Sequence, residues 1–161
     1  MEFGKDELAA IIPSIKVQSI ENEGVIKKAE LNFKKGLNII IGENATGKTT
    51  ALKAIVNNAG NLGVNVNSIL NSENHEEKIG VLFTGILGVL PERYPNSCLV
   101  IDDFLGRLSE EKRKVLLKSL INSKVQVITA TIPSAINKKL LKYLLSNKVN
   151  IIQTEKFILN N

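Results

Sequence analysis

Residues 37–50 read LNIIIGENATGKTT, a short apolar run followed by a loop that is bounded by glycines. Within this stretch, residues 42–49 match the pattern G-x-x-x-x-G-K-[ST] at every fixed position. A phosphate-binding loop of this type needs a buried strand before it and a helix after it. The β-branched run at 37–41 predicts that strand, and the apolar spacing over residues 48–58 predicts that helix. The stretch therefore predicts a P-loop that binds a nucleoside triphosphate.

The residue types in the loop fit the chemistry of a polyphosphate. Consecutive backbone N–H groups can donate to several phosphate oxygens at once, and the positive end of the following helix adds to them. Glycine at 42 permits a sharp exit from the strand, and glycine at 47 permits a close approach of the backbone. Lys48 can reach the β- and γ-phosphates, and Thr49 can offer its hydroxyl to Mg²⁺. The predicted nucleotide-binding residues are Gly42, Glu43, Asn44, Ala45, Thr46, Gly47, Lys48, Thr49 and Thr50.

A second acidic site follows another apolar run. Residues 98–101 read CLVI and predict a buried strand, which ends at Asp102 and Asp103. Adjacent residues on a strand point in opposite directions, so the two carboxylates cannot share one role. Asp102 is predicted to hold Mg²⁺ together with Thr49. Asp103 is predicted to be the catalytic base that faces the attacking water, with Lys48 as the other catalytic residue.

The rest of the chain predicts an α/β fold. Strand patterns alternate with helix patterns after residue 36, which favours a three-layer P-loop NTPase with a mostly parallel central sheet. An antiparallel hairpin precedes it, with its turn at 21–24, and the first dozen residues predict a lead-in with a short helical patch. Further strands are expected at 125–129, 149–152 and 157–159, and helices at 79–90, from Ser109 to about 121, and at 134–145.

Composition narrows the class of protein. The 161 residues, 43% hydrophobic and 23% charged, predict a single domain over 1–161 and exclude a disordered tail. No tract has the roughly 18 consecutive apolar residues of a membrane span, and the opening residues lack the order of a secretory signal, so a cytoplasmic location is expected. Cys98, alone of its kind, is expected to be a buried hydrophobe.

The net charge of +5 is compatible with an acidic partner. However, 18 of the 21 basic residues are lysines, and they are scattered along the chain rather than gathered in one run. Solvated faces explain this distribution as well as a path for DNA does. Charge alone therefore leaves DNA as a candidate partner without favouring it.

The stretch FKKGLNIIIGENATGKTTALKAI at 33–55 resembles the ATPase heads of the ABC superfamily, above all the branch with SMC-type, RecF-type and OLD-like ATPases. Residues 99–102 resemble the Walker B strand of that family, and residues 106–109 resemble its D-loop. The N-terminal hairpin agrees as well. The resemblance implies ATP and Mg²⁺ as ligands. It also implies a homodimer or heterodimer that sandwiches ATP, with Ser72, Arg107 and Ser109 as contacts contributed by the partner.

The sequence departs from the family pattern in ways that bear on turnover. The family has a glutamate as catalytic base, where this chain has Asp103. Ile132 and Pro133 stand where the switch histidine is expected, and residues 71–74 are only a degraded counterpart of the signature motif. The glutamine of the Q-loop and the helical arm or coiled coil are missing. The resemblance thus implies a trimmed core that binds ATP and hydrolyses it slowly.

Two other functions remain open on the sequence. The first is a nucleotide-gated binding or regulatory module that never hydrolyses ATP, which the departures above favour. The second is a small-molecule or nucleotide kinase, which shares the P-loop. Kinases usually close an arginine-rich lid over the phosphates, and this chain has three arginines, Arg93, Arg107 and Arg113.

Overall fold

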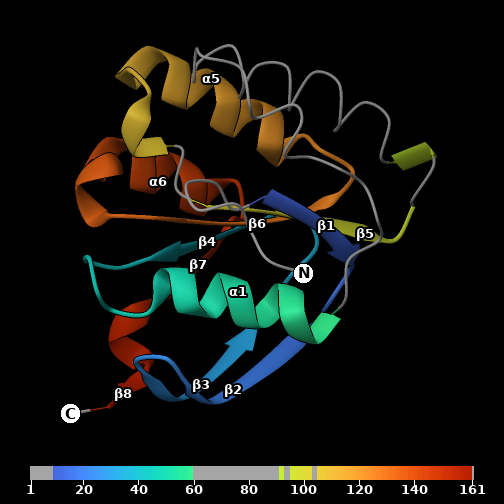
Figure 1. The fold of residues 1–161 in the computed structure, drawn as a ribbon. Coiled ribbons are helices and arrows are strands. Elements are labelled where there is room, and N and C mark those ends of the chain that lie inside the picture. Colours follow the sequence, from blue (N-terminus) through green and yellow to red (C-terminus); the bar gives the residue numbers. More distant parts are fainter. Residues whose placement is uncertain (1–8, 60–90, 93–94, 103–104, 161) are drawn as a thin grey trace.

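The computed structural model of the chain describes residues 9–59, 91–92, 95–102 and 105–160. A five-stranded sheet runs through its centre in the order β1-β5-β6-β4-β7 (Figure 1). Four of the strands are mutually parallel, and β1 pairs with β5 in the antiparallel direction. The strands span Ala9–Pro13 (β1), Ser97–Ile101 (β5), Gln126–Thr131 (β6), Leu37–Ile41 (β4) and Asn150–Gln153 (β7).

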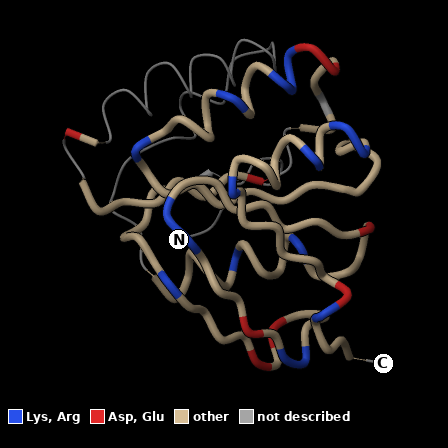
Figure 2. Tube along the Cα trace, turned by 180° about the vertical axis from the view of Figure 1, so that it is seen from behind, with Lys and Arg blue, Asp and Glu red and all other residues tan. Residues whose placement is uncertain are grey.

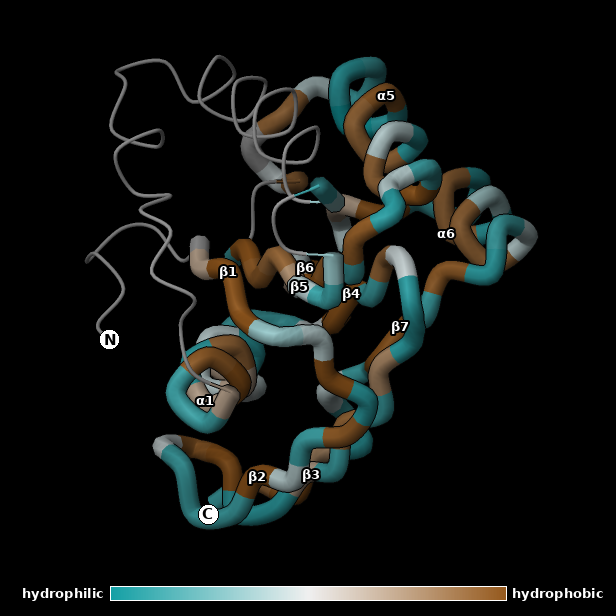
Figure 3. The backbone as a smooth tube through the Cα atoms, turned by 90° about the vertical axis from the view of Figure 1, so that its right-hand side faces the viewer, coloured by the Kyte–Doolittle hydropathy of each residue, from teal (hydrophilic) through white to brown (hydrophobic). Residues whose placement is uncertain are grey.

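Helices cover both faces of this sheet (Figure 1). One face packs against α5 (Glu110–Ile121) and α6 (Lys138–Ser146), with Leu117, Leu120 and Leu144 fully buried there. The other face packs against α1 (Lys48–Ala59), which buries Leu52 and Ile55. Hydrophobic and hydrophilic residues alternate along α5 and α6 in Figure 3, because each helix turns one side to the sheet and the other to water.

A second, three-stranded antiparallel sheet lies on the far side of α1 (Figure 1). Its strands are β2 (Val17–Glu23), β3 (Ile26–Asn32) and β8 (Ile158–Leu159), in the order β2-β3-β8. Ile20, Ile26 and Leu31 are fully buried from this sheet in the cluster that also holds the apolar side of α1. The helix after the glycine-rich loop is therefore enclosed between two sheets.

A buried polar network joins the two sheets at the amino ends of the parallel strands. The side chain of Asn38 is fully buried, accepts from Lys34 N at 2.9 Å and donates to Lys34 O at 2.9 Å and to Val127 O at 3.2 Å. The Gln126 amide accepts from Ile15 N at 3.0 Å and donates to Ile15 O at 2.8 Å. These bonds fix the segments that enter and leave the hairpin against the central sheet.

The α/β class, the mostly parallel sheet and the N-terminal hairpin are confirmed. The predicted strands at 37–41, 98–101, 125–129 and 149–152 are present with ends that differ by one or two residues, and the helix over 48–58 is α1. Two predictions are wrong. Residues 9–13 form the edge strand β1 rather than a helical patch, because Ile11 and Ile12 are buried on opposite faces of the sheet.

The helix predicted for 134–145 begins later than expected. Pro133–Ala135 forms a short 3₁₀ turn (η3), and α6 begins at Lys138 after Asn137, whose side chain accepts from Leu140 N at 2.7 Å. The asparagine is a strong N-cap, which explains the shift. The helix predicted for 79–90 lies outside the described residues. Among the helices that are described, none has the length and apolar character needed to cross a membrane.

Candidate phosphate-binding site

The glycine-rich loop lies at the carboxyl edge of the central sheet, between the end of β4 and the start of α1. Gly42 N donates to Thr131 O at 3.2 Å, which joins the first residue of the loop to the end of β6. Ala45 and Gly47 both have positive φ angles, 64° and 100°. The helix then begins at Lys48, so its unpaired N–H groups and positive end face the space above the loop. This geometry is that of a site for an anion.

The two glycines of the motif are required for different reasons. Gly47 needs its positive φ, and a Cβ there would lie 2.9 Å from Ile26 Cγ1. Gly42 has an ordinary φ, but a Cβ on it would lie 2.0 Å from Thr154 Oγ1 and 2.7 Å from Thr46 Oγ1. In the structure Gly42 leaves space for two threonines, a requirement that the sequence did not indicate.

The ammonium group of Lys48 is held by the loop itself. The side chain is 9% exposed, and Nζ donates to the carbonyl oxygens of Gly42 and, at 3.0 Å, of Glu43. Thr46 Oγ1 also donates to the Glu43 carbonyl, at 2.6 Å. The ammonium group is thus already hydrogen-bonded within the loop, next to the positions where phosphate oxygens would lie.

A cavity of about 280 Å³ opens in front of the loop and brings two predicted sites together. Its walls include the start of α1 and also Asp102, the residue that follows β5. Val100 and Cys98 of β5 pack in the cluster on the α1 face of the sheet, and alternation carries Asp102 to that same face. The lining residues are Val25, Asn44, Ala45, Gly47, Lys48, Thr49, Thr50 and Asp102.

The donor set in this cavity fits Mg²⁺. Magnesium is usually bound by one or two carboxylates, with phosphate oxygens and water completing its shell. Thr49 and Asp102 line the cavity together, one as a hydroxyl and one as a carboxylate. No group of three or more histidine, cysteine, aspartate or glutamate side chains that could hold a metal occurs in the described part of the chain. A metal bound here would therefore depend on its ligand's phosphates for part of its shell.

The remaining predicted residues are only partly described. Asp103 and Ser72 lie outside the described residues, and so does the side chain of Arg107, whose backbone belongs to the 3₁₀ turn η2 (Leu105–Arg107). Ser109 is exposed and caps α5, where its Oγ accepts from Lys112 N at 3.4 Å. Glu43, Asn44, Ala45 and Thr49 are exposed along the loop, whereas Gly42 and Gly47 are buried.

Three residues near the site were not found from the sequence. Arg113 donates to three backbone carbonyls, those of Leu105 at 2.9 Å, Leu108 at 3.0 Å and Ala135 at 2.7 Å, and so ties the turn after β5 to the turn after β6. Val25, at the tip of the hairpin, lines the cavity and is 43% exposed. Thr154 donates a hydrogen bond to Thr46 of the loop. Val25 and Thr154 are far from the loop in sequence, and Arg113 reaches Ala135 across 22 positions, so no local pattern indicates these contacts.

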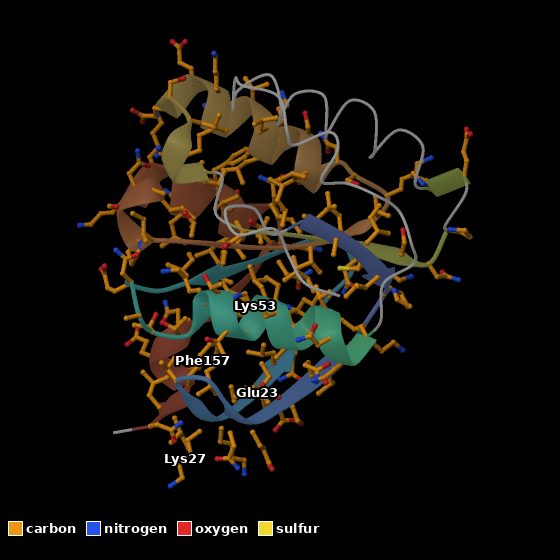
Figure 4. All side chains as sticks on the ribbon, viewed as in Figure 1. Glu23, Lys27, Lys53 and Phe157 are labelled. Carbon is orange, nitrogen blue, oxygen red and sulfur yellow. The ribbon has the colours of Figure 1, made fainter. Side chains whose placement is uncertain are left out.

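Phe157 packs beside Gly47 of the loop. It lies between the start of α1 and the antiparallel sheet (Figure 4) and is 8% exposed. A Cβ on Gly47 would lie 3.6 Å from its ring. A second cavity, of about 520 Å³, opens behind the loop between α6 and the residues that follow β7.

Cys98 is buried, as the sequence predicted. Burial raises the pKa of its thiol far above the usual range, although a backbone hydrogen bond with Ile128 lowers it somewhat. The thiol is therefore neutral at any ordinary pH and takes no part in the chemistry of the cavity.

Comparison with curated proteins and with solved structures gave no match. A family model described as an AAA domain matches residues 19–156, which include most of the hairpin, the loop, Asp102 and the turn that begins at Thr154. The match and the loop geometry agree on a P-loop ATPase domain, and the chain belongs to the AAA domain family.

Proposed function

We propose that residues 1–161 are a single three-layer P-loop NTPase domain of the ABC/SMC-like class that binds ATP and hydrolyses it slowly. ATP binding would drive two subunits together, so that the domain acts as a dimerising switch in the cytoplasm. One observation carries the proposal: the loop residues Lys48 and Thr49 and the strand-end carboxylate of Asp102 line the same cavity at the carboxyl edge of the sheet. Ligands of open α/β sheets bind at this edge.

The loop would bind the triphosphate by rearranging very little. Lys48 Nζ has three protons and gives two hydrogen bonds to loop carbonyls, so it can turn toward the β- and γ-phosphates without leaving the loop. The exposed amides after Gly42 and at the start of α1 would donate to the remaining oxygens. The proposed nucleotide-binding residues are Gly42, Glu43, Asn44, Ala45, Thr46, Gly47, Lys48, Thr49 and Thr50.

The cavity is sized for the phosphates rather than for a whole nucleotide. Pockets that enclose a small molecule usually have about 300–1,000 Å³, and this cavity has about 280 Å³. The nucleoside would therefore extend out of it. Val25 is an apolar, partly exposed side chain at the wall of the cavity, and Gly24 next to it lies against Thr50. We propose that the nucleoside leaves the cavity along this hairpin tip.

Hydrolysis would use the two aspartates in different roles. Thr49 and Asp102 would hold Mg²⁺, which neutralises charge on the phosphates when it is bound. Asp103 follows Asp102 and would orient the attacking water and accept its proton. Because its side chain is one methylene shorter than a glutamate, the water would be held less closely. Slow turnover follows from that shorter reach.

The proposed dimer would complete the site from a second subunit, identical or different. Ser109 is exposed, and η2 just before it is joined to α5 and to the turn η3 through Arg113. A rigid loop at this edge could present Arg107 and Ser109 to the nucleotide of a partner, with Ser72 as the third contact. Arg113 donates to three backbone carbonyls. One of the three arginines in the chain therefore already has a structural role, which weighs against an arginine-rich kinase lid.

The proposal includes a link to DNA, which the net charge of +5 motivates. Figure 2 shows lysines and arginines spread over several elements of the described chain, with acidic residues between them. Fluorescence anisotropy with labelled single- and double-stranded DNA tests the link, with and without ATP, at 50 and 200 mM salt. Binding that weakens steeply with salt would support it. Equal, unchanged anisotropy under all conditions would exclude it.

The central experiment compares the wild type with Lys48→Ala and Asp103→Asn. Calorimetry with Mg·ATP measures binding, light scattering measures the dimer, and radiolabelled ATP measures phosphate release. We expect the wild type to bind, to dimerise with ATP and to release phosphate slowly. Lys48→Ala should lose binding, and Asp103→Asn should keep it while trapping the dimer. Absence of binding by the wild type at millimolar Mg·ATP would refute the proposal, and binding without any release would leave the non-hydrolysing module.

A further inference from the structure

Thr154 reaches the phosphate loop from a distant part of the chain. It is the first residue of the 3₁₀ turn η4 (Thr154–Lys156), directly after the edge strand β7, and its side chain is 4% exposed. Its Oγ1 donates to Thr46 Oγ1 at 2.9 Å across 108 positions of sequence. Thr46 Oγ1 in turn donates to the Glu43 carbonyl at 2.6 Å. A chain of two hydrogen bonds therefore runs from η4 into the loop.

The first glycine of the motif makes room for this contact. Thr154 lies so close to Gly42 that a Cβ there would fall 2.0 Å from Oγ1 and 2.6 Å from Cγ2 of the threonine. Any other residue at 42 would push the threonine away from Thr46. The glycine and the remote threonine are thus two parts of one arrangement.

The hydrogen-bond chain fixes the direction of one peptide plane. In a trans peptide, the carbonyl of Glu43 and the N–H of Asn44 point in opposite directions. With the carbonyl held by Thr46 Oγ1 and Lys48 Nζ, the N–H of Asn44 points away from them. Asn44 lines the cavity in front of the loop. The arrangement holds this amide ready to donate to an anion in the cavity.

The loop needs such support because part of its backbone is unfavourable. Ala45, with φ at 64°, occupies a region that residues with a side chain seldom adopt. Strained backbone persists only where surrounding contacts hold it. We propose that Thr154 is a positioning residue, which holds the P-loop in its phosphate-binding conformation through Thr46. This role rests on the proposed function, since it takes the ligand of the loop to be a polyphosphate.

The test compares Thr154→Val, which keeps the shape and removes the hydroxyl, with Thr154→Ser, which keeps the hydroxyl. We expect Thr154→Val to raise the Kd for Mg·ATP about tenfold, and Thr154→Ser to stay within about twofold of the wild type. Thr129→Val is the matched control. Thr129 is fully buried in β6, and its hydroxyl has no hydrogen-bond partner among the described residues, so the Kd should not change.

A double variant tests whether the two threonines act as one unit. Thr46→Val removes the shared hydroxyl, so Thr46→Val with Thr154→Val should bind no more weakly than Thr46→Val alone. Equal affinities of Thr154→Val and the wild type would overturn the inference. Equal losses in Thr154→Val and Thr154→Ser would overturn it too, because packing and not the hydroxyl would then matter. Independent, multiplying effects of the two valines would have the same consequence.

NMR relaxation separates this inference from the proposed function. In the protein without nucleotide, the backbone order parameters of residues 43–47 should fall in Thr154→Val and keep their wild-type values in Thr154→Ser and Thr129→Val. This measurement needs no ligand. If the wild type fails to bind Mg·ATP, the proposed function falls and the order parameters still decide on the positioning role. Unchanged order parameters in Thr154→Val would overturn it.

Discussion

The amino ends and the carboxyl ends of the parallel strands differ in how their polar groups are hydrogen-bonded. At the amino ends, the side chain of Asn38 makes five hydrogen bonds, to backbone groups and to Asn150. Gln126 is bonded to the segments on both sides of the hairpin. At the carboxyl ends, Lys48 Nζ donates to two carbonyls of its own loop, and Asn44, Ala45 and Thr49 are exposed beside the cavity.

This difference separates stability from binding. Buried polar groups that are fully paired hold a structure together, and removing one of them leaves its partners unpaired. Donors that face a cavity contribute little to the fold and can be used by a ligand. We therefore expect substitutions at the amino ends to lower the free energy of unfolding and to leave the affinity for nucleotide unchanged. Substitutions of the residues that face the cavity at the carboxyl ends should instead weaken nucleotide binding and change the free energy of unfolding little.

Lys48→Ala should give the largest effect, which is on binding. The ammonium would give charge-assisted hydrogen bonds to two phosphates, each worth about 1.5–3 kcal/mol. Loss of both would weaken Mg·ATP binding by about 4 kcal/mol, or roughly a thousandfold, in calorimetry. Lys53→Ala is the matched control, because Lys53 is exposed farther along the same helix (Figure 4). Equal affinities of Lys48→Ala and Lys53→Ala for Mg·ATP would contradict the claim that the carboxyl edge binds the nucleotide.

Asn38→Ala should give the next largest effect, on stability. The change leaves several buried backbone groups unpaired and opens a small cavity, which together lower the free energy of unfolding by about 3 kcal/mol. Urea unfolding measures this loss. Asn147→Ala provides the control, because the Asn147 amide donates to Tyr143 O at an exposed helix end. Similar urea midpoints for both variants, or a changed Kd for Mg·ATP in folded Asn38→Ala, would contradict the division between the two edges.

Arg113→Lys tests a carboxyl-edge residue that is structural. A lysine keeps the charge but cannot reach three carbonyls in one plane, so we expect a loss of about 2 kcal/mol in urea unfolding. Amides 105–109 and 134–136 should exchange faster, while the Kd for Mg·ATP stays within about twofold. Lys114→Ala, at an exposed neighbouring position, is the control. Unchanged exchange in both turns would remove the role of the guanidinium in joining them.

The sequence predicted what depends on local pattern. The loop at 42–49 combines a fixed motif with a strand and a helix in its immediate neighbourhood, so its position between them followed directly. The sequence also predicted that Asp102 and Thr49 act together, and both residues line one cavity. At 9–13 the apolar pattern was too short to distinguish a strand from a helix, and pairing with β5 makes this segment a strand.

The remaining features depend on contacts between distant residues. Gly42 was interpreted from backbone freedom alone, whereas the structure shows that it accommodates Thr154, which comes from the far end of the chain. Arg113 was counted only as one of three arginines, and its bond to Ala135 spans 22 positions. A glycine's neighbour or a guanidinium's acceptors are set by the packing of whole elements, and no local spacing encodes them.

The smallest expected effect concerns Cys98, near the amino end of β5. Burial raises the pKa of its thiol well above the value of 9.0 in the unfolded chain. The resulting stability is present below pH 9.0 and is lost as the pH rises above it, because the unfolded state alone releases the proton. Between pH 8 and pH 10 the wild type should lose about 1.4 kcal/mol more than Cys98→Ala in urea unfolding. Parallel pH profiles would mean that water reaches the thiol and that the amino half of the sheet is less tightly closed than its hydrogen bonds indicate.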